Sequence, residues 1–235
     1  MEVELKKKPK KPTIIEGFPG LGLVGTIATE FLIEHLKAKP IGSAWSNDLP
    51  PIIAVHEGKA VQPIGIFYDE KHNILIMHAV SGVMGMEWQI ADEIVKLAKQ
   101  LDAKEIISLE SIGTTEEKPE ARAFFYTNDD KKIAKLKAAK TEQLTEGIVI
   151  GVTGALLLKS EIPFSCIFAE THSSLPDSKA AAKIIEVLDS YLGLDIDTKP
   201  LLKSAEKFEQ KIKSIISQSQ AATEKAKDKK LGYIG

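Results

Sequence analysis

Near the N-terminus, residues 13–36 read TIIEGFPGLGLVGTIATEFLIEHL and contain three different patterns in a row. The apolar run Thr13-Ile14-Ile15 predicts a short strand. Two glycines and a proline within residues 17–20 then predict a turn. From Leu23 to Leu36, apolar residues recur at helical spacing and predict an amphipathic helix. These residues therefore predict a strand–turn–helix unit, which is typical of an α/β domain.

The same alternation continues along most of the chain. Strand and helix patterns follow one another from residue 13 to residue 192. This order predicts a three-layer α/β/α sandwich around a mixed, largely parallel sheet. The strands between residues 40 and 79 have only short links, so that part is expected to be antiparallel or mixed. The apolar residues 148–150 predict a further strand, followed by a short helix over residues 155–159.

The domain organisation is expected to be one core with an appendage. The α/β core domain covers residues 1–197 and begins with a flexible basic lead-in at 1–11. A C-terminal helical arm is expected over 198–220, and a flexible tail with an apolar, aromatic end over 221–235. In the arm, apolar residues are spaced four and three apart. This spacing fits two explanations equally: a helix packed back on its own domain, or a helix at an oligomer interface. The apolar residues are Leu201, Ala205, Phe208, Ile212 and Ile215.

Composition excludes several classes of protein. The 235 residues include 31 basic and 33 acidic residues, giving a net charge of −2, and only Arg122 is an arginine. A nucleic-acid-binding protein is therefore not expected. The only cysteine, Cys166, excludes an intramolecular disulfide and a multi-cysteine metal site. No apolar run is long enough to span a bilayer, and no apolar signal core follows the N-terminus, so a cytoplasmic protein is expected.

A glycine-rich motif follows the first predicted strand. Gly20, Gly22 and Gly25 match the GxGxxG pattern that lets a dinucleotide pyrophosphate approach a helix N-terminus. The acidic residue expected about twenty positions later is not found at the end of a strand. Asp48 lies near that distance but beside two prolines. A strand-to-helix turn that needs small residues for close packing is the favoured interpretation.

No catalytic constellation, metal site or cofactor site can be assembled from the remaining residues. Glu170 and His172 flank Thr171 at the end of a predicted central strand, where they are either an acid/base pair or part of a turn. The turn is favoured because no third partner is evident. Glu87 and Glu110 are carboxylates near predicted turns. The histidines lack the spacing of a zinc site.

Several segments together resemble a known family. They are EGFPGLGLVG at 16–25, the glycine-bracketed segment before Glu87-Trp88, ISL at 107–109, GVTGA at 151–155, AETH at 169–172, LPD at 175–177 and the helix after LDID at 194–197. In this order they resemble the proteasome assembly chaperone 2 family, in its archaeal branch. The resemblance covers nearly residues 13 to 215.

The resemblance implies an α/β sandwich similar to nucleoside phosphorylases, with a helical C-terminal extension. It also implies a non-enzymatic homo-oligomer that assists assembly of the 20S proteasome by binding its α subunits, and leaves open a hetero-complex with a paralogue. A candidate cleft would be lined by Gly17, Phe18, Pro19, Gly20, Gly22, Glu87, Glu170 and His172.

The C-terminal end is similar to a proteasome-binding tail. Some archaeal members of the family end in a hydrophobic residue, a tyrosine and any residue, and this tail enters pockets between α subunits. Here Leu231, Tyr233, Ile234 and Gly235 form a similar end, although the tyrosine is third from the end rather than second. Two alternatives to a chaperone stay open: a ligand-binding protein or enzyme that uses the cleft, and a structural oligomeric scaffold.

Overall fold

The computed structural model of the chain describes residues 1–49, 54–56, 59–114, 121–172, 175–198 and 214. Its strands are β1 (Glu2–Leu5), β2 (Thr13–Gly17), β3 (Lys39–Trp45), β4 (Ala54–His56), β5 (Lys59–Val61), β6 (Ile64–Asp69), β7 (Ile74–Ala79), β8 (Glu105–Gly113), β9 (Ala123–Thr127), β10 (Glu142–Gln143) and β11 (Phe164–Thr171). Its helices are the 3-10 turn η1 (Leu21–Leu23), α1 (Val24–His35), α2 (Glu87–Gln100), α3 (Asp130–Ala138), α4 (Gly151–Lys159) and α5 (Ser178–Leu192).

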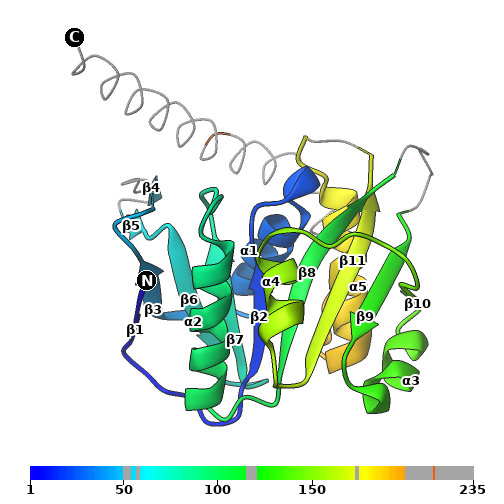
Figure 1. The fold of residues 1–235 in the computed structure, drawn as a ribbon, viewed down its shortest axis with the longest axis horizontal. Helices are drawn as coiled ribbons and strands as arrows, with labels where there is room; N and C mark the ends of the chain where they lie inside the picture. Colours follow the sequence, from blue (N-terminus) through cyan, green and yellow to red (C-terminus); the bar gives the residue numbers. More distant parts are fainter. Residues whose placement is uncertain (50–53, 57–58, 115–120, 173–174, 199–213, 215–235) are drawn as a thin grey trace.

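The sheet is mixed, as the sequence predicts. Nine of the described strands pair in the order β1-β3-β6-β7-β2-β8-β11-β9-β10, while β4 and β5 pair separately (Figure 1). The central strands β7, β2, β8 and β11 are parallel to one another. Strands β3, β6 and β7 are antiparallel, which confirms the expectation for residues 40–79. The carboxyl ends of the four central strands therefore meet at one edge of the sheet.

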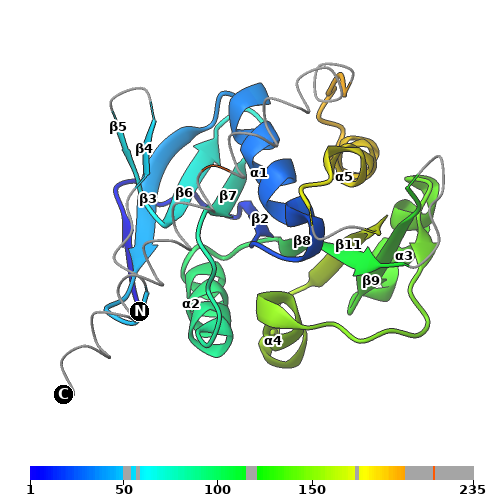
Figure 2. The same ribbon diagram turned by 90° about the horizontal axis from the view of Figure 1, so that it is seen from above.

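Helices cover both faces of the sheet. Viewed from above, α1 and α5 lie on one face and α2 and α4 on the other (Figure 2). Side chains alternate along β2, so Ile15 packs on the α1 and α5 side and Ile14 on the α2 and α4 side. Both residues are fully buried. The sequence-predicted sandwich thus has two apolar cores, separated by the sheet.

Local sequence explains where the two longest of the described helices lie and begin. Helix α2 buries Ile90, Ile94 and Leu97, which are spaced to share one face. Helix α5 begins at the expected cap, because the side chain of Asp177 accepts a hydrogen bond from the Ala180 N–H at 3.0 Å. It ends at Gly193, whose φ of 70° is the left-handed conformation that glycine adopts readily.

Two local predictions are wrong. Residues 2–5 are not a flexible lead-in but form the edge strand β1, paired antiparallel with β3. Residues 148–150 do not form a strand: their backbone is irregular, and α4 begins directly after them at Gly151. Ile148 and Ile150 point outward rather than into a core, so their apolar character does not indicate burial.

The helical arm expected at 198–220 lies outside the described residues except for 198 and 214, and the tail at 221–235 lies outside them entirely. The expected oligomer interface and the expected proteasome-binding tail are therefore not described. In the part of the chain that is described, no helix is long and apolar enough to cross a membrane.

Candidate functional site

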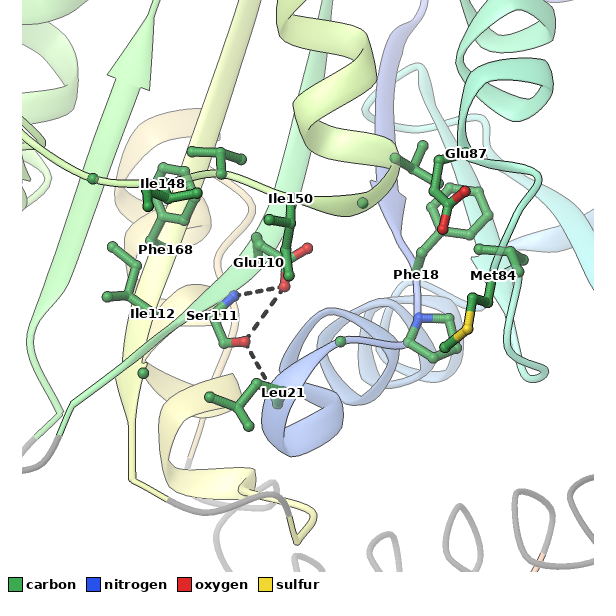
Figure 3. Close-up of a pocket in the computed structure, with 18 of the residues that line it drawn as sticks. Phe18, Leu21, Met84, Glu87, Glu110, Ser111, Ile112, Ile148, Ile150 and Phe168 are labelled. Atoms are coloured by element: carbon green, nitrogen blue, oxygen red, sulfur yellow. Dashed lines mark hydrogen bonds between the residues drawn. The ribbon is translucent and has the colours of Figure 1, made fainter.

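A cavity of about 640 Å³ lies at the carboxyl edge of the central strands (Figure 3). Ligands of α/β sheets commonly bind at this edge. The turn after β2, the turn before α2, the end of β8 and the segment before α4 all contribute to the lining. It consists of residues 18–21, 82–84, 87, 110–113, 144, 146–152 and 168.

Glycines allow the β2–α1 connection to pass close to β8. A Cβ on Gly25 would lie 2.3 Å from the carbonyl oxygen of Leu109, so only glycine permits this approach. Gly22 has a φ of +64°, which favours glycine at the turn. A Cβ on Gly20 would lie 2.6 Å from Oε1 of Glu110. These contacts favour the close-packing interpretation of the motif, since a carboxylate borders the turn where a pyrophosphate would have to approach.

Glu110 lies in the carboxyl half of β8 and lines the cavity. Its Oε1 accepts a hydrogen bond from the Ser111 N–H at 2.9 Å. The Ser111 hydroxyl donates to the Leu21 carbonyl at 2.7 Å and so ties β8 to the turn after β2. Burial raises the pKa of Glu110 from its ordinary value to about 7, although hydrogen bonds from Ser111 and Thr153 oppose the shift.

A second carboxyl group, Glu16, is buried deeper on the same side of the sheet. The Ser108 hydroxyl donates to Glu16, and the hydroxyls of Ser108 and Thr153 are 2.6 Å apart. Burial is the main reason that the pKa of Glu16 rises to about 8, and the charge of Glu110 adds to the shift. Glu16 therefore keeps its proton at neutral pH and links β2, β8 and α4 as a structural group.

Cys166 lies in this region but is not a reactive thiol. It is fully buried in β11. Burial and the nearby carboxyl groups of Glu110 and Glu16 raise the pKa of its thiol well above the ordinary value. A thiol held in this way is inert, which agrees with the sequence-based interpretation of a small buried hydrophobe.

The structure brings half of the predicted cleft residues together. Phe18, Pro19, Gly20 and Glu87 line the cavity. Gly17, Gly22, Glu170 and His172 do not. The predicted acid/base pair is therefore not part of the cavity.

Glu170 has a different partner. Its buried carboxylate meets the guanidinium of Arg122, with Nη2 2.6 Å and Nε 3.1 Å from its oxygens. This two-point contact joins the end of β11 to the segment before β9 and is a structural interaction. It also engages the only arginine of the chain.

Sequence reasoning missed the residues at the mouth of the cavity. Met84 and Ile148 are each 94% exposed, and Ile150 is 77% exposed. They come from the turn before α2 and from the irregular segment before α4. We call these three lining residues, Met84, Ile148 and Ile150, the apolar rim. Exposed apolar residues gathered around a cavity are typical of a binding surface.

The charges of the lining have one sign. Glu87, Glu110 and Glu146 contribute carboxylates, and none of the lining residues, all of which are described, is Lys, Arg or His. Phe18, Ile112 and Phe168 supply apolar surface. The cavity is thus suited to an apolar or cationic group and disfavours a phosphate or other anion.

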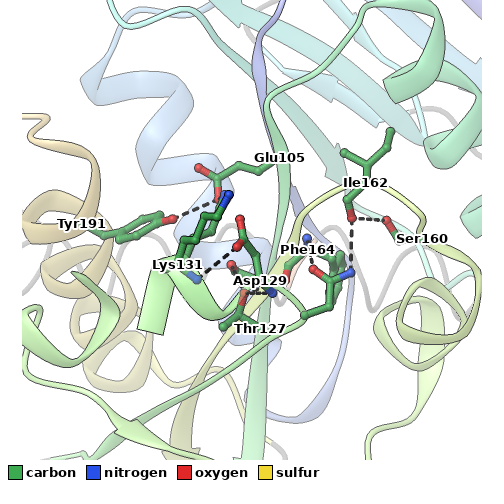
Figure 4. A network of polar contacts seen from close by, with 11 residues as sticks. Glu105, Thr127, Asp129, Lys131, Ser160, Ile162, Phe164 and Tyr191 are labelled. Atoms are coloured by element: carbon green, nitrogen blue, oxygen red, sulfur yellow. Dashed lines mark hydrogen bonds and ion pairs between the residues drawn. The ribbon is translucent and has the colours of Figure 1, made fainter. Parts of the chain in front are cut away.

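The opposite edge of the sheet holds a network of polar contacts (Figure 4). The Tyr191 hydroxyl donates to Glu105 Oε2 at 3.1 Å, and Lys132 forms an ion pair with the same carboxylate. Asn128 Oδ1 accepts from the Phe164 N–H at 2.7 Å. These contacts fix α3 and α5 to the amino ends of β8 and β11. Among described residues, no cluster of His, Cys, Asp or Glu is placed to hold a metal.

Known proteins similar to this chain share its fold over almost its full length. An uncharacterized protein of Methanocaldococcus jannaschii is 29% identical, covering 96% of this chain and 94% of that protein. The crystal structure of Pyrococcus furiosus PbaA, described as an archaeal homolog of proteasome-assembly chaperone, is 30% identical with a TM-score of 0.85, covering 94% of this chain and 100% of PbaA. Pyrococcus furiosus PbaB, described as an archaeal proteasome activator, has the same fold at 22% identity and a TM-score of 0.75, covering 91% and 98%. The model of the PAC2 family matches residues 14–216, and the chain therefore belongs to the PAC2 family.

Proposed function

We propose that this protein is a non-enzymatic assembly chaperone that binds the 20S proteasome or its α subunits. The observation that carries the proposal is the likeness to PbaA, which extends over 94% of this chain at 30% identity. A shared fold alone does not specify function. Here the family membership and the description of PbaA as a chaperone homolog point in the same direction.

We propose further that the protein works as a homo-oligomer and carries its contacts to the proteasome on its C-terminal tail. The arm residues Leu201, Phe208 and Ile212 have the spacing of an interface helix. The tail that follows ends in Tyr233-Ile234-Gly235. Several tails on one oligomer would bind together more tightly than one tail alone, without any new contact.

The test combines light scattering with size-exclusion chromatography, for the full chain alone and mixed with 20S proteasome or isolated α subunits. A defined oligomer that co-elutes with either is expected. Deletion of residues 231–235 should abolish co-elution and leave the oligomer intact. An oligomer that never co-elutes would contradict the chaperone function, and unchanged binding of the deletion variant would contradict the role of the tail.

The cavity supports one alternative function, the binding of a small ligand. Its 640 Å³ would accommodate a molecule of nucleoside size. The carboxylates of Glu87, Glu110 and Glu146 argue against a phosphorylated ligand. A thermal-shift screen with nucleosides, nucleotides and phosphate separates the two functions, because the chaperone proposal predicts no stabilisation by any of them.

A further inference from the structure

The three side chains of the apolar rim surround the cavity and are exposed. Met84 and Ile148 are almost fully exposed, and Ile150 is exposed over three quarters of its surface. They stand around an opening whose interior is also apolar, lined by Phe18 and Phe168. Exposed apolar side chains around an apolar cavity are typical of a site for another polypeptide.

The cavity itself selects the charge of what enters it. Glu110 lies between Ile150 and Ser111 in Figure 3, and its Oε1 accepts a hydrogen bond from the Ser111 N–H at 2.9 Å. This contact holds the carboxylate in place before any partner arrives. Glu87 and Glu146 add negative charge to the lining, in which no described residue is basic. Burial leaves Glu110 only partly ionised near pH 7, and a cation beside it favours its charged form. A cation is attracted more strongly to a carboxylate in a cavity than to one at an open surface.

We propose that the cavity and the apolar rim bind a segment of a partner polypeptide in which a lysine or arginine is flanked by apolar residues. The cationic side chain enters the cavity and pairs with Glu110, and the flanking apolar side chains pack on Met84, Ile148 and Ile150. This inference rests on the proposed function, in which the partner is a protein. It assigns a binding surface on the core domain that is separate from the C-terminal tail.

The arrangement matches the way that protein interfaces concentrate their binding energy. A few anchor side chains in desolvated pockets contribute most of the affinity, and arginine is among the commonest anchors. The surrounding apolar contacts exclude water from the ion pair. Methionine, as at Met84, suits a surface that adapts to different apolar neighbours.

The first experiment measures fluorescence anisotropy of labelled synthetic peptides with the full-length protein. The probe is the capped peptide Leu-Ile-Lys-Phe-Leu, compared with peptides that carry norleucine or glutamate in place of the lysine. The lysine peptide should bind at least tenfold more tightly than the glutamate peptide. Equal binding of the three peptides would overturn the inference without any variant being needed.

Variants locate the site. Glu110→Gln, which keeps an acceptor for Ser111, should weaken the lysine peptide about tenfold and leave the norleucine peptide unchanged. Ile148→Ser should weaken both peptides. The matched controls are Leu158→Ser, a 78% exposed residue of α4 outside the lining, and the exposed Glu142→Gln. Neither control should change binding, and equal losses in the controls and the site variants would overturn the assignment.

Two further arms separate the remaining explanations. Hexylamine, as a small cation, should bind far more weakly than the peptide; if it binds equally well and Ile148→Ser has no effect, the occupant is a small molecule and not a polypeptide. Co-elution with proteasome α subunits is then measured for the same variants. If Glu110→Gln and Ile148→Ser bind the α subunits with wild-type affinity, the inference that this partner uses the cavity is overturned, and the proposed function stands on the tail alone. If the wild-type protein does not bind the α subunits but still prefers the lysine peptide, the proposed function is wrong and the peptide site stands.

Discussion

Gly20 and Glu110 meet at the edge of the cavity so closely that a Cβ on residue 20 would lie 2.6 Å from Oε1 of Glu110. The glycine belongs to the turn after β2 and the carboxylate to the carboxyl half of β8. The absence of a side chain at residue 20 therefore creates the space in which Glu110 stands. The glycine-rich motif of this chain thus makes room for a carboxylate of the protein itself, at the place where a phosphate would bind in a dinucleotide site.

A first prediction concerns the glycines of this turn. Gly20→Ala should lower the free energy of unfolding by about 1–2 kcal/mol, because the added Cβ meets Glu110. The loss stays small because the end of the Glu110 side chain can move aside. Gly25→Ala should cost about 3 kcal/mol or prevent folding, since its Cβ would meet the backbone oxygen of Leu109 at 2.3 Å. Urea denaturation measures both.

Gly82→Ala is the control for these variants, because no described atom beyond its chain neighbours lies within 4 Å of its added Cβ. It should change stability by less than about 0.5 kcal/mol. A Gly25→Ala variant as stable as the control would mean that α1 and β8 are not packed as closely as described.

A second prediction concerns the pH dependence of stability. The raised pKa of Glu16, about 8, means that the folded state holds a proton that the unfolded chain loses above about pH 4.5. The contribution of Glu16 to the free energy of unfolding is therefore greatest below about pH 4.5, and it is lost as the pH rises toward 8. Glu16→Gln should resemble wild type at about pH 5 and be more stable by roughly 2–4 kcal/mol at about pH 8.5.

Urea denaturation at a series of pH values tests this prediction. Glu110 titrates in the same window, so some pH dependence should remain in Glu16→Gln and should decrease further in the double variant with Glu110→Gln. The exposed Glu142→Gln serves as the control. Stability curves for Glu16→Gln and wild type that run parallel from pH 5 to 8.5 would show that Glu16 is not a buried acid.

A third prediction concerns the ion pair between Arg122 and Glu170. The side chain of Glu170 is 8% exposed and that of Arg122 46% exposed, so removing the arginine leaves a nearly buried carboxylate. Arg122→Met should lower the free energy of unfolding by about 1–2 kcal/mol. Combining it with Glu170→Gln should restore part of the loss. A double-mutant cycle with zero coupling would contradict a stabilising role.

A fourth prediction concerns the network at the amino edge of the sheet. Tyr191→Phe removes the hydroxyl that donates to Glu105 at 3.1 Å and keeps the ring. The carboxylate retains Lys132, so the loss should be about 1 kcal/mol. Tyr126→Phe, at an exposed position, should have no measurable effect. Equal thermal unfolding of the two variants would contradict the contribution of this hydrogen bond.

Much of the fold followed from local pattern. The alternation of strands and helices predicts the α/β layers, and the short links between residues 40 and 79 predict antiparallel strands, both of which the structure confirms. The pattern failed at Ile148 and Ile150, because an apolar triplet predicts burial only where the chain lies against a core. It failed at residues 2–5 because pairing at the edge of a sheet uses backbone groups. A charged segment can therefore pair with β3 as well as an apolar one.

The candidate site was predicted less completely than the fold. Phe18, Pro19, Gly20 and Glu87 adjoin recognisable turns and were found. The sequence-based cleft leaves out Glu110. A carboxylate that follows an apolar run, as Glu110 follows Leu109, is the signal that could have indicated it. Nothing in the sequence alone indicates that Ile148, Phe168 and Met84 face one opening, since they come from three separate segments.

The sequence by itself determined most of the elements, the apolar faces of the helices and the membership in the PAC2 family. Each of these is encoded by residues near one another along the chain or by motifs in order. Only the tertiary structure decided the environment of each polar group. Glu16, Glu110 and Glu170 are the same residue type, yet one is a buried acid, one lines a cavity and one pairs with Arg122. The physical reason is that burial and partners, which set the charge state of a carboxyl group, come from segments distant in sequence that meet only when the sheet forms.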